Sequence, residues 1–307
     1  MSDRIPFRAR PMLATAVDRP FHRPGWVYEE KYDGYRILAY KEGRTVTLLS
    51  RNGKQRTESF AEIAAAVAKL DAQTMLLDGE AVAFDERLVS RFQLLQRHDV
   101  PVMYVVFDCL YLNGRDLRRE PLRERRRALE DAVQESERLF PSRRLGTNGL
   151  VAYRLAKKAG YEGVVAKDLS SEYVEGRSTK WLKVKVTQEE EFVIGGYTTP
   201  AGSRSYFGAL LLGAYGKLCL HYVGKVGTGF STDMLASLWK TFRPLVQEVP
   251  PFVDPPRERG VTWLAPQLVA QVAFSEWTDD RRLRQPVFLG LRDDKTPREC
   301  VLPKGLR

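Results

Sequence analysis

Cysteine and histidine are scarce in this chain of 307 residues, which contains only three of each. The cysteines, Cys109, Cys219 and Cys300, are too widely spaced for a disulfide framework or a set of zinc ligands, which indicates a reducing compartment. The histidines likewise lack metal-ligand spacing. The sequence shows neither a signal peptide nor an apolar run long enough to cross a bilayer, so we expect a cytoplasmic protein that does not engage a membrane.

Basic residues are in excess, with 49 lysines and arginines against 39 aspartates and glutamates and a net charge of +10. Most of this excess lies in residues 1–187, which hold 34 basic and 26 acidic side chains. Such a balance favours a polyanionic partner, nucleic acid before membrane. Hydrophobic residues make up 43% of the chain, enough to build the core of one large domain or two ordinary ones.

One lysine near the N-terminus is distinguished by its surroundings. Lys31 lies between two apolar runs that are typical of strands, Trp26–Tyr28 and Ile37–Tyr40, and directly before the turn signal Asp33–Gly34. Glycine adopts positive φ without steric cost, so we expect a tight turn here, with Lys31 at the end of the first strand. A lysine amine acts as a nucleophile when its pKa is lowered, but a hairpin with a solvated lysine fits this stretch equally well.

Three further patterns place charged side chains on elements that otherwise look apolar. Asp78 and Glu80 lie two apart in a strand-like run and share one face of a sheet, where carboxylates need a partner or a cation. Lys183 and Lys185 alternate with apolar residues, which indicates either a bound anion or an exposed sheet edge. Residues 118–127 hold six arginines, which fit either contacts to DNA phosphates or a solvated helix face.

The residue pattern changes after the polar run 187–191, where short strand-like segments begin to recur. We therefore expect a first domain over residues 1–187 and a second domain over residues 188–307. Short strands are predicted in the second domain at 192–198, 207–215, 217–226 and 266–276, with one helix near 232–242. Their spacing, with turns rich in glycine and proline, predicts a small all-β barrel.

Taken in order, these motifs resemble those of the covalent nucleotidyltransferases, a superfamily of DNA ligases, RNA ligases and mRNA capping enzymes. Lys31–Gly34 with Arg36 resembles the nucleotidyl-lysine motif K-x-D-G. The remaining family motifs follow in their expected order, at Ser50–Gly53, Leu77–Glu80, Tyr104–Asp108, Glu162–Lys167, Trp181–Lys185 and Arg284–Lys295. The resemblance spans almost the whole chain. The amino-acid sequence of residues 288–295 is most similar to that of the ligase domain of bacterial ligase D, the end-joining ligase.

This resemblance implies an α+β fold in which a nucleotidyltransferase (adenylation) domain of antiparallel sheets and flanking helices precedes a small OB-fold β-barrel. It implies an ATP-dependent DNA ligase that seals nicks between a 5′-phosphate and a 3′-hydroxyl, in DNA repair by non-homologous end joining. In that reaction the lysine attacks the α-phosphate of ATP, AMP passes to the 5′-phosphate, and the 3′-hydroxyl displaces AMP.

The resemblance also implies a role for each spaced residue. Lys31 carries AMP, and neighbouring Lys183, Lys185 and Mg²⁺ are expected to lower its pKa. Glu162 is expected to bind the catalytic Mg²⁺, for which Mn²⁺ is an alternative. The other expected roles are Glu29 at the adenine edge, Phe107 stacked on adenine, Glu80 on the ribose, Arg36 and Arg51 on phosphate, Lys167 on the nucleotide, and Arg292, Asp294 and Lys295 on the pyrophosphate leaving group.

Several of these roles have structural alternatives. Phe107 could be plain core, and Glu80 could be the partner of a structural ion pair. Lys167 lies five positions after Glu162, so a straight strand would place the two side chains on opposite faces.

Nicked or broken duplex DNA is the expected partner of a monomeric, nucleoid-associated enzyme, and Ku and a separate end-joining polymerase are further candidates. An RNA ligase or a capping-type guanylyltransferase shares the lysine chemistry. A non-catalytic protein could instead use the barrel as a platform for nucleic acid. The presence of every expected catalytic residue and the amino-acid sequence of residues 288–295 favour DNA ligation over both alternatives.

Overall fold

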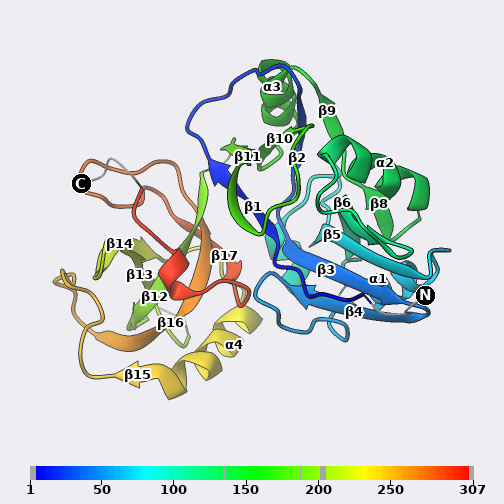
Figure 1. Cartoon of the computed structure of the whole chain (residues 1–307). Helices are drawn as coiled ribbons and strands as arrows, with labels where there is room; N and C mark the ends of the chain where they lie inside the picture. Colours follow the sequence, from blue (N-terminus) through cyan, green and yellow to red (C-terminus); the bar gives the residue numbers. More distant parts are fainter. Residues whose placement is uncertain (1–4, 98, 134–135, 187, 201–204, 304–307) are drawn as a thin grey trace. The chain divides into compact units, whose positions relative to one another are not determined.

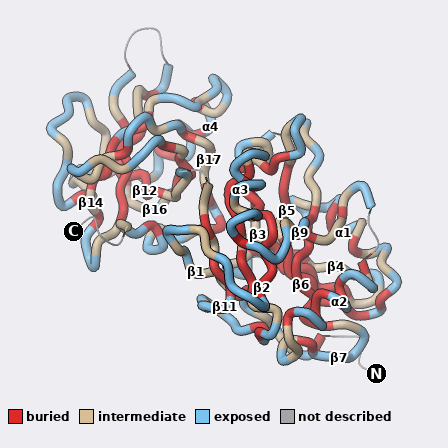
Figure 2. Tube along the Cα trace, turned by 90° about the horizontal axis from the view of Figure 1, so that it is seen from above, coloured by how far each residue is buried: buried red, intermediate tan, exposed pale blue. Residues whose placement is uncertain are grey.

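The computed structural model describes residues 5–97, 99–133, 136–186, 188–200 and 205–303, and the chain divides into two compact units (Figure 1). Unit 1 is Met1–Thr187 and unit 2 is Gln188–Arg307. Each unit buries its own hydrophobic clusters along its central strands, as the burial colours of Figure 2 show. Every helix in the described part of the chain is too short or too polar to cross a lipid bilayer.

Two β-sheets form the frame of unit 1. The elements are β1 (Met12–Ala16), β2 (Trp26–Lys31), β3 (Tyr35–Glu42), β4 (Thr45–Ser50), α1 (Ala61–Ala68), β5 (Thr74–Val82), the 3₁₀ helix η1 (Phe92–Gln96), β6 (Met103–Leu112), β7 (Arg115–Asp116), α2 (Leu122–Ala132), β8 (Leu139–Pro141), β9 (Arg144–Gly146), α3 (Gly149–Ala159), β10 (Gly163–Asp168) and β11 (Gly176–Lys185). The first sheet has the order β1-β11-β10-β2-β9, and the second has the order β4-β3-β5-β6-β7 with β8 beside β6.

Most neighbouring strands are antiparallel, as predicted, but two pairs are parallel. β8 runs parallel to β6 because the chain returns to that strand through the crossover helix α2. β1 runs parallel to β11, which lies far from it in the sequence. Each of the two sheets, predicted to be antiparallel, is therefore mixed, with one parallel pair of strands.

The second sheet carries α1 and α2 on one face and turns its other face toward the first sheet. Ile37 and Ala39 of β3 pack in the core beneath the two helices. Leu38 and Tyr40, the alternate residues of the same strand, pack with Trp181 of β11. This alternation follows from the two-residue period of a strand. Polar side chains on the inner faces of both sheets can therefore meet between them.

The step at Asp33–Gly34 carries the chain from the first sheet to the second, so the hairpin alternative is wrong. β2 pairs with β9 and β10, whereas β3 pairs with β4 and β5. The expected positive φ at Gly34 is also absent; a Cβ there would instead lie 2.2 Å from the carbonyl oxygen of Ala81, so only glycine fits. Asp33 fixes the crossing, because its carboxylate accepts a hydrogen bond from the Phe92 N–H at 2.9 Å and its own N–H donates to the Ser90 hydroxyl at 3.0 Å.

Unit 2 is built on a six-stranded sheet. Its elements are β12 (Glu189–Thr198), β13 (Leu210–Tyr215), β14 (Leu220–Val226), α4 (Thr232–Phe242), η2 (Arg243–Leu245), β15 (Val246–Gln247), β16 (Val261–Ala273), β17 (Val287–Leu291) and η3 (Pro297–Glu299). The order is β14-β13-β12-β16-β15, with β17 also beside β16. β12 begins at Glu189, so the end of the polar run 187–191 already belongs to this sheet, while Thr187 lies outside the described residues.

Contrary to the prediction, the sheet of unit 2 does not close into a barrel within its described residues. Near the end of β14, the Phe288 N–H of β17 donates a single hydrogen bond to the Thr228 carbonyl at 3.0 Å. The Leu283 N–H likewise donates to the Val223 carbonyl at 2.9 Å. These isolated bonds replace a closing ladder, because β17 is only five residues long and a bulge interrupts its pairing with β16. The unit is therefore OB-fold-like but open.

Candidate active site

Lys31 is the last residue of β2, and its ammonium group forms an ion pair with Glu162, the residue before β10. Gly163 lies opposite both Lys31 and Lys185, so the two lysines flank the carboxylate. The Lys185 Nζ lies 3.9 Å from the second carboxylate oxygen. A Cβ at Gly163 would lie 2.2 Å from the Val184 carbonyl oxygen, so the glycine lets β10 and β11 approach each other beside Glu162.

This ion pair determines the charge of both partners. Burial is the largest single influence on Lys31 and lowers its pKa, but the charge of Glu162 and its hydrogen bond, with Asp33 and Glu80, raise the pKa above its usual value. Burial raises the pKa of Glu162, but the three nearby lysines outweigh burial and lower it. Both groups are therefore charged at neutral pH. The prediction of a lowered pKa for Lys31 is wrong for this structure, because the nearest charge is the Glu162 carboxylate.

Lys183 and Lys185 lie on an interior strand, so the alternative of an exposed sheet edge is wrong. β11 runs between β1 and β10. Lys183 lies opposite Val165 of β10, which in turn lies opposite Glu29 of β2. Directly opposed residues share one face of a sheet. The two lysines therefore share the inner face of the first sheet with Glu29 and Lys31.

Glu29 is the centre of a buried polar network. Its Oε2 accepts hydrogen bonds from the Lys167 Nζ at 2.7 Å and from the Ser142 hydroxyl at 2.8 Å. Its Oε1 lies 3.4 Å from Arg126 Nη1, which also donates to the Ser142 hydroxyl at 2.6 Å. Burial, the largest influence, lowers the pKa of Lys167 although Glu29 raises it. Four buried polar groups thus satisfy one another behind Lys31.

Lys167 and Glu162 reach the same face of the sheet, so the straight-strand argument that separated them is wrong. Lys167 contacts Glu29 and Glu162 contacts Lys31, and these two partners lie two residues apart on β2. Glu162 precedes β10 and is not bound by the alternation of that strand.

Arg126 and Ser142 were missed by the sequence analysis. The arginine-rich segment was expected to contact DNA phosphates or to form a solvated helix face, and neither alternative describes Arg125 or Arg126. Arg125 is fully buried and pairs with both oxygens of Asp108 at 2.8 Å. The available signal was helical spacing, because Leu122, Arg125, Arg126 and Leu129 are the buried face of α2.

The second sheet contributes an arginine that is already held by a carboxylate. Arg36 of β3 forms a two-pronged ion pair with Asp78 of β5, with Nη2 and Oδ2 2.7 Å apart. The Tyr173 hydroxyl donates to the same Oδ2 at 2.6 Å. Asp78 is fully buried and has the partners that its burial requires. Glu80 is half-buried and lies opposite Arg36 in the ladder between β3 and β5.

Phe107 lies on the inner face of the second sheet, at an irregularity in β6. The pairing of β5 with β6 skips Phe107, which is therefore the extra residue of a β-bulge. Bulges re-aim side chains beside active sites. The Phe107 ring meets the Trp181 ring edge-on, with centroids 6.0 Å apart. Arg36 and Lys167 each place their cationic group 4.5 Å from the ring centroid, so the ring is both packed in the core and bordered by the polar site.

The remaining predicted residues lie on a loop of unit 1 and in unit 2. Arg51 follows β4 and lines a groove beside the N-terminal segment. Arg292 follows β17 and forms a buried two-pronged ion pair with Asp294, with both nitrogen–oxygen distances at 2.8 Å. Its Nη1 donates to the Gln271 side chain at 2.7 Å. The Lys295 Nζ lies 3.3 Å from a carboxylate oxygen of Glu191 on β12.

A magnesium ion is compatible with the donor set around Lys31. Among the described residues, no group of three or more His, Cys, Asp and Glu side chains could hold a metal ion. Mg²⁺ nevertheless binds commonly through one or two carboxylates together with waters and substrate phosphates. Glu162, a hard oxygen ligand between lysines that suit phosphate, fits that mode of binding.

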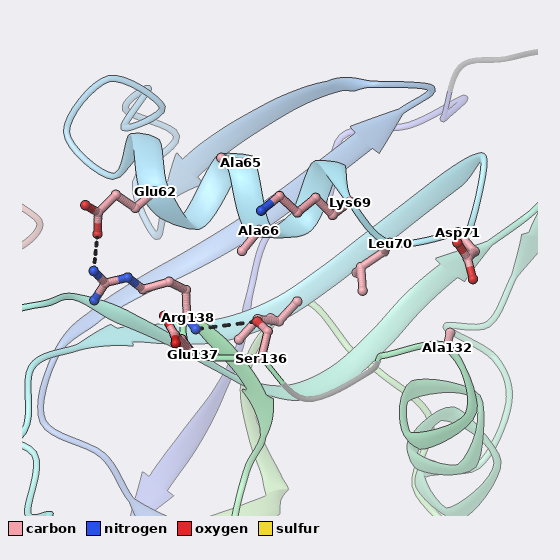
Figure 3. Close-up of a pocket in the computed structure, with 11 residues that line it drawn as sticks. Glu62, Ala65, Ala66, Lys69, Leu70, Asp71, Ala132, Ser136, Glu137 and Arg138 are labelled. Atoms are coloured by element: carbon pink, nitrogen blue, oxygen red, sulfur yellow. Dashed lines mark hydrogen bonds and ion pairs between the residues drawn. The ribbon is translucent and has the colours of Figure 1, made fainter.

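A cavity of about 510 Å³ lies elsewhere in unit 1, between α1 and residues 132–139 (Figure 3). Figure 3 shows Glu62 of α1 reaching Arg138, and the two charged groups are 3.0 Å apart. None of the predicted site residues lines this cavity, which lies on the helix-covered side of the second sheet. It is therefore separate from the site around Lys31.

Comparison with known protein families finds one matching family model in each unit. Residues 11–185 match the ATP dependent DNA ligase domain, and residues 203–295 match the ATP dependent DNA ligase C terminal region. The multifunctional non-homologous end joining proteins LigD of Pseudomonas aeruginosa and Mycolicibacterium smegmatis are 41% and 40% identical over 304 and 299 residues. Each match covers 95% of this chain but only 36% and 39% of the relatives.

A solved structure of mycobacterial DNA ligase D, complexed with ATP and MES, is similar to this chain with a TM-score of 0.73 and 37% identity. The match covers 95% of this chain and 98% of that chain. The ligase domain of LigD from M. tuberculosis is also similar, with a TM-score of 0.55 and 37% identity. These likenesses confirm the predicted fold class of a nucleotidyltransferase domain followed by an OB-fold-like domain, apart from the closure of the barrel.

Proposed function

The chain belongs to the family of ATP-dependent DNA ligases, and on that premise we propose that it seals nicks between a 5′-phosphate and a 3′-hydroxyl through a lysyl-AMP intermediate. The observation that carries the proposal is the position of Lys31 at the end of β2, beside Glu162 and the lysines of β11. Phosphoryl transfer is catalysed mainly by positioning and by neutralising charge, and this arrangement supplies cations on both sides of one carboxylate.

Each proposed step exchanges one bond to phosphorus for another. The Lys31 Nζ first attacks the α-phosphorus of ATP, so that a nitrogen–phosphorus bond forms and pyrophosphate leaves. A 5′-phosphate oxygen of the nick then attacks the same phosphorus and frees Lys31. The 3′-hydroxyl finally attacks the 5′-phosphorus, AMP leaves, and the strand is continuous.

Lys31 must lose its proton before the first of these steps. In the structure that proton is held by the ion pair with Glu162. Bound Mg²⁺ would supply positive charge to the phosphate oxygens and compete with Lys31 for the Glu162 carboxylate, and Mn²⁺ could replace it. Once that contact is weakened, burial and the like charges of Lys183 and Lys185 favour the neutral amine.

The inner faces of the two sheets would hold the nucleotide. We assign Glu29 to the adenine edge, Phe107 to stacking on the base, and Glu80 to the ribose. Their support is the buried network that fixes Glu29 and the bulge that presents Phe107. The proposed phosphate contacts are those of Arg36, Arg51, Lys167, Lys183 and Lys185. Arg292, Asp294 and Lys295 are assigned to the first step, in which pyrophosphate leaves.

We propose non-homologous end joining as the setting, because the LigD relatives carry that name. Duplex DNA with nicks or breaks is then the substrate, and Ku and a separate polymerase are the candidate protein partners of a monomeric, nucleoid-associated ligase. Stimulation of end joining by purified Ku tests this setting separately from nick sealing.

The proposed reaction is tested by supplying ATP or GTP labelled at the α-phosphate and detecting labelled protein by denaturing electrophoresis, while a second portion of the native protein receives nicked duplex DNA. Label from ATP alone, followed by closure of the DNA nick, is the expected result. Label from GTP would identify a capping-type enzyme, and closure of RNA nicks only would identify an RNA ligase. A protein that takes no label from either nucleotide would overturn the proposal.

A further inference from the structure

A basic groove runs beside the N-terminal segment of unit 1, outside the lysine cluster of the candidate active site. Its volume is about 1,000 Å³, and it is lined on one side by Arg8 and Arg10 and on the other by Arg51, Asn52 and Gln55 of the loop after β4. The lining residues that the structure describes include three arginines and no aspartate or glutamate. Arg8 and Arg10 are exposed, so the groove presents positive charge to solvent.

The segment that carries Arg8 and Arg10 is fixed along its backbone. The Ala9 N–H donates to the Tyr40 hydroxyl at 2.8 Å, and the Arg10 N–H donates to the Glu175 carboxylate at 3.0 Å. The Met12 N–H then donates to the Tyr173 hydroxyl at 2.8 Å. Figure 1 shows this dark-blue segment running along β3 into β1. The two arginines are therefore held at set positions and do not belong to a loose tail.

The groove continues from the candidate active site. Arg36 donates a hydrogen bond to the Met12 carbonyl at 3.0 Å, and Leu13, the next residue of β1, lines the groove. Leu38, two residues after Arg36 on the same face of β3, lines it too. A polymer whose reacting end lies near Arg36 could thus extend along the groove toward Arg51.

We propose that this groove binds the sugar-phosphate backbone of the DNA substrate, with Arg8 and Arg10 as phosphate contacts. The proposal rests on the proposed ligase function. Arginine forks bind phosphate oxygens in two-pronged, charge-assisted contacts, and neutral donors such as Asn52 and Gln55 commonly add hydrogen bonds to the backbone. Such contacts position DNA without reading its sequence, which suits an enzyme that closes nicks wherever they occur.

The test is the salt dependence of binding to a nicked duplex, compared between the parent and the double variant Arg8→Gln/Arg10→Gln. Each lost phosphate contact reduces the slope of log affinity against log salt by about 0.9. The double variant should therefore show a slope shallower by about 1.8 and an affinity weaker by about tenfold or more at physiological salt. The matched control is Arg154→Gln/Lys157→Gln on the exposed side of α3, which removes the same charge and should keep the parent slope.

A second variant guards against loss of folding, since the Arg8 guanidinium lies over the Tyr40 ring at 5.4 Å. Asn52→Asp places an acid on the opposite wall of the groove and should also weaken binding. If Arg8→Gln/Arg10→Gln and Asn52→Asp both bind like the α3 control, the groove does not hold DNA and the proposal is overturned. If the parent itself neither binds nor seals nicked DNA, the proposed ligase function fails instead.

Discussion

Replacing Glu162 by glutamine should lower the pKa of Lys31 by about two units. The substitution keeps the size of the side chain and removes the charge that raises the pKa of Lys31. Burial, the largest influence on Lys31, disfavours the protonated amine and would then be opposed by the weaker influences of Asp33 and Glu80. The variant should therefore carry a more nucleophilic Lys31 in the absence of nucleotide and metal.

The magnitude follows from Coulomb's law. Two opposite charges about 4 Å apart attract by about 4 kcal/mol at an effective dielectric constant of about 20. One pKa unit corresponds to about 1.4 kcal/mol, so the limit is a fall of about three units. The Lys31 side chain remains 18% exposed, and water screens part of this attraction. Allowing for this screening, we expect the pKa of Lys31 to fall by about two units when the Glu162 charge is removed.

The assay is competitive acetylation of the nucleotide-free and metal-free protein across a range of pH, with peptide mass spectrometry to follow Lys31. Glu62→Gln is the matched control, because Glu62 pairs with Arg138 on the helix-covered side of the second sheet. The reactivity midpoint of Lys31 should fall in Glu162→Gln and stay at the parent value in Glu62→Gln. Equal midpoints in Glu162→Gln and the parent would refute the reasoning.

Three other results are expected. Combining Arg292→Ala with Lys295→Ala should abolish adenylylation of the enzyme, because contacts to pyrophosphate assist only the first step. Single-turnover sealing of a pre-adenylylated nick should stay within about tenfold of the parent, which corresponds to about 1.4 kcal/mol of barrier. Equal loss of both activities would contradict this prediction. Burial raises the pKa of Glu30 to about 7, although Arg143 lowers it, so the contribution of Glu30 to parent stability should fall as pH rises from about 4.5 to about 7. In urea unfolding, Glu30→Gln should therefore gain about 3 kcal/mol at pH 8 but little at pH 4, and a pH profile identical to that of the parent would oppose this account. Because the pKa of Lys31 is raised and that of Glu162 is lowered, their ion pair should stabilise the fold fully between about pH 5 and pH 10. The thermal stability of Glu162→Gln should approach that of the parent only above this range, where Lys31 loses its proton, or below it, where Glu162 gains one.

The sequence predicted the features of the site that depend on local pattern. The alternation around Lys183 and Lys185 placed both lysines on one face, and the turn residues placed Lys31 at the end of a strand. Pattern could not tell that β2 and β3 belong to different sheets, because strand partners are chosen by contacts between distant segments. The glycine at position 34 was predicted to provide a positive φ, but it is required because a side chain there would collide with a carbonyl of β5. That contact also joins distant segments, so the local pattern could not reveal it.

Charged residues were the hardest to place from sequence. Arg125 and Arg126 looked like surface residues, but they occupy buried positions because Asp108 and Glu29 neutralise them from other strands. The raised pKa of Lys31 has the same origin, since its nearest partner, Glu162, is distant in the sequence. The bulge at Phe107 likewise arises from the pairing of β5 with β6 and leaves no clear mark in the residue pattern.

The most direct test of the central claim is the intact mass of the protein after exposure to ATP and a divalent cation, followed by peptide mapping. One adenylyl group on Lys31 is the predicted result, absent in Lys31→Ala and retained in Lys157→Ala, an exposed lysine of α3. An undiminished adduct in Lys31→Ala, or an adduct that maps to another residue, would contradict the assignment of Lys31 as the nucleophile.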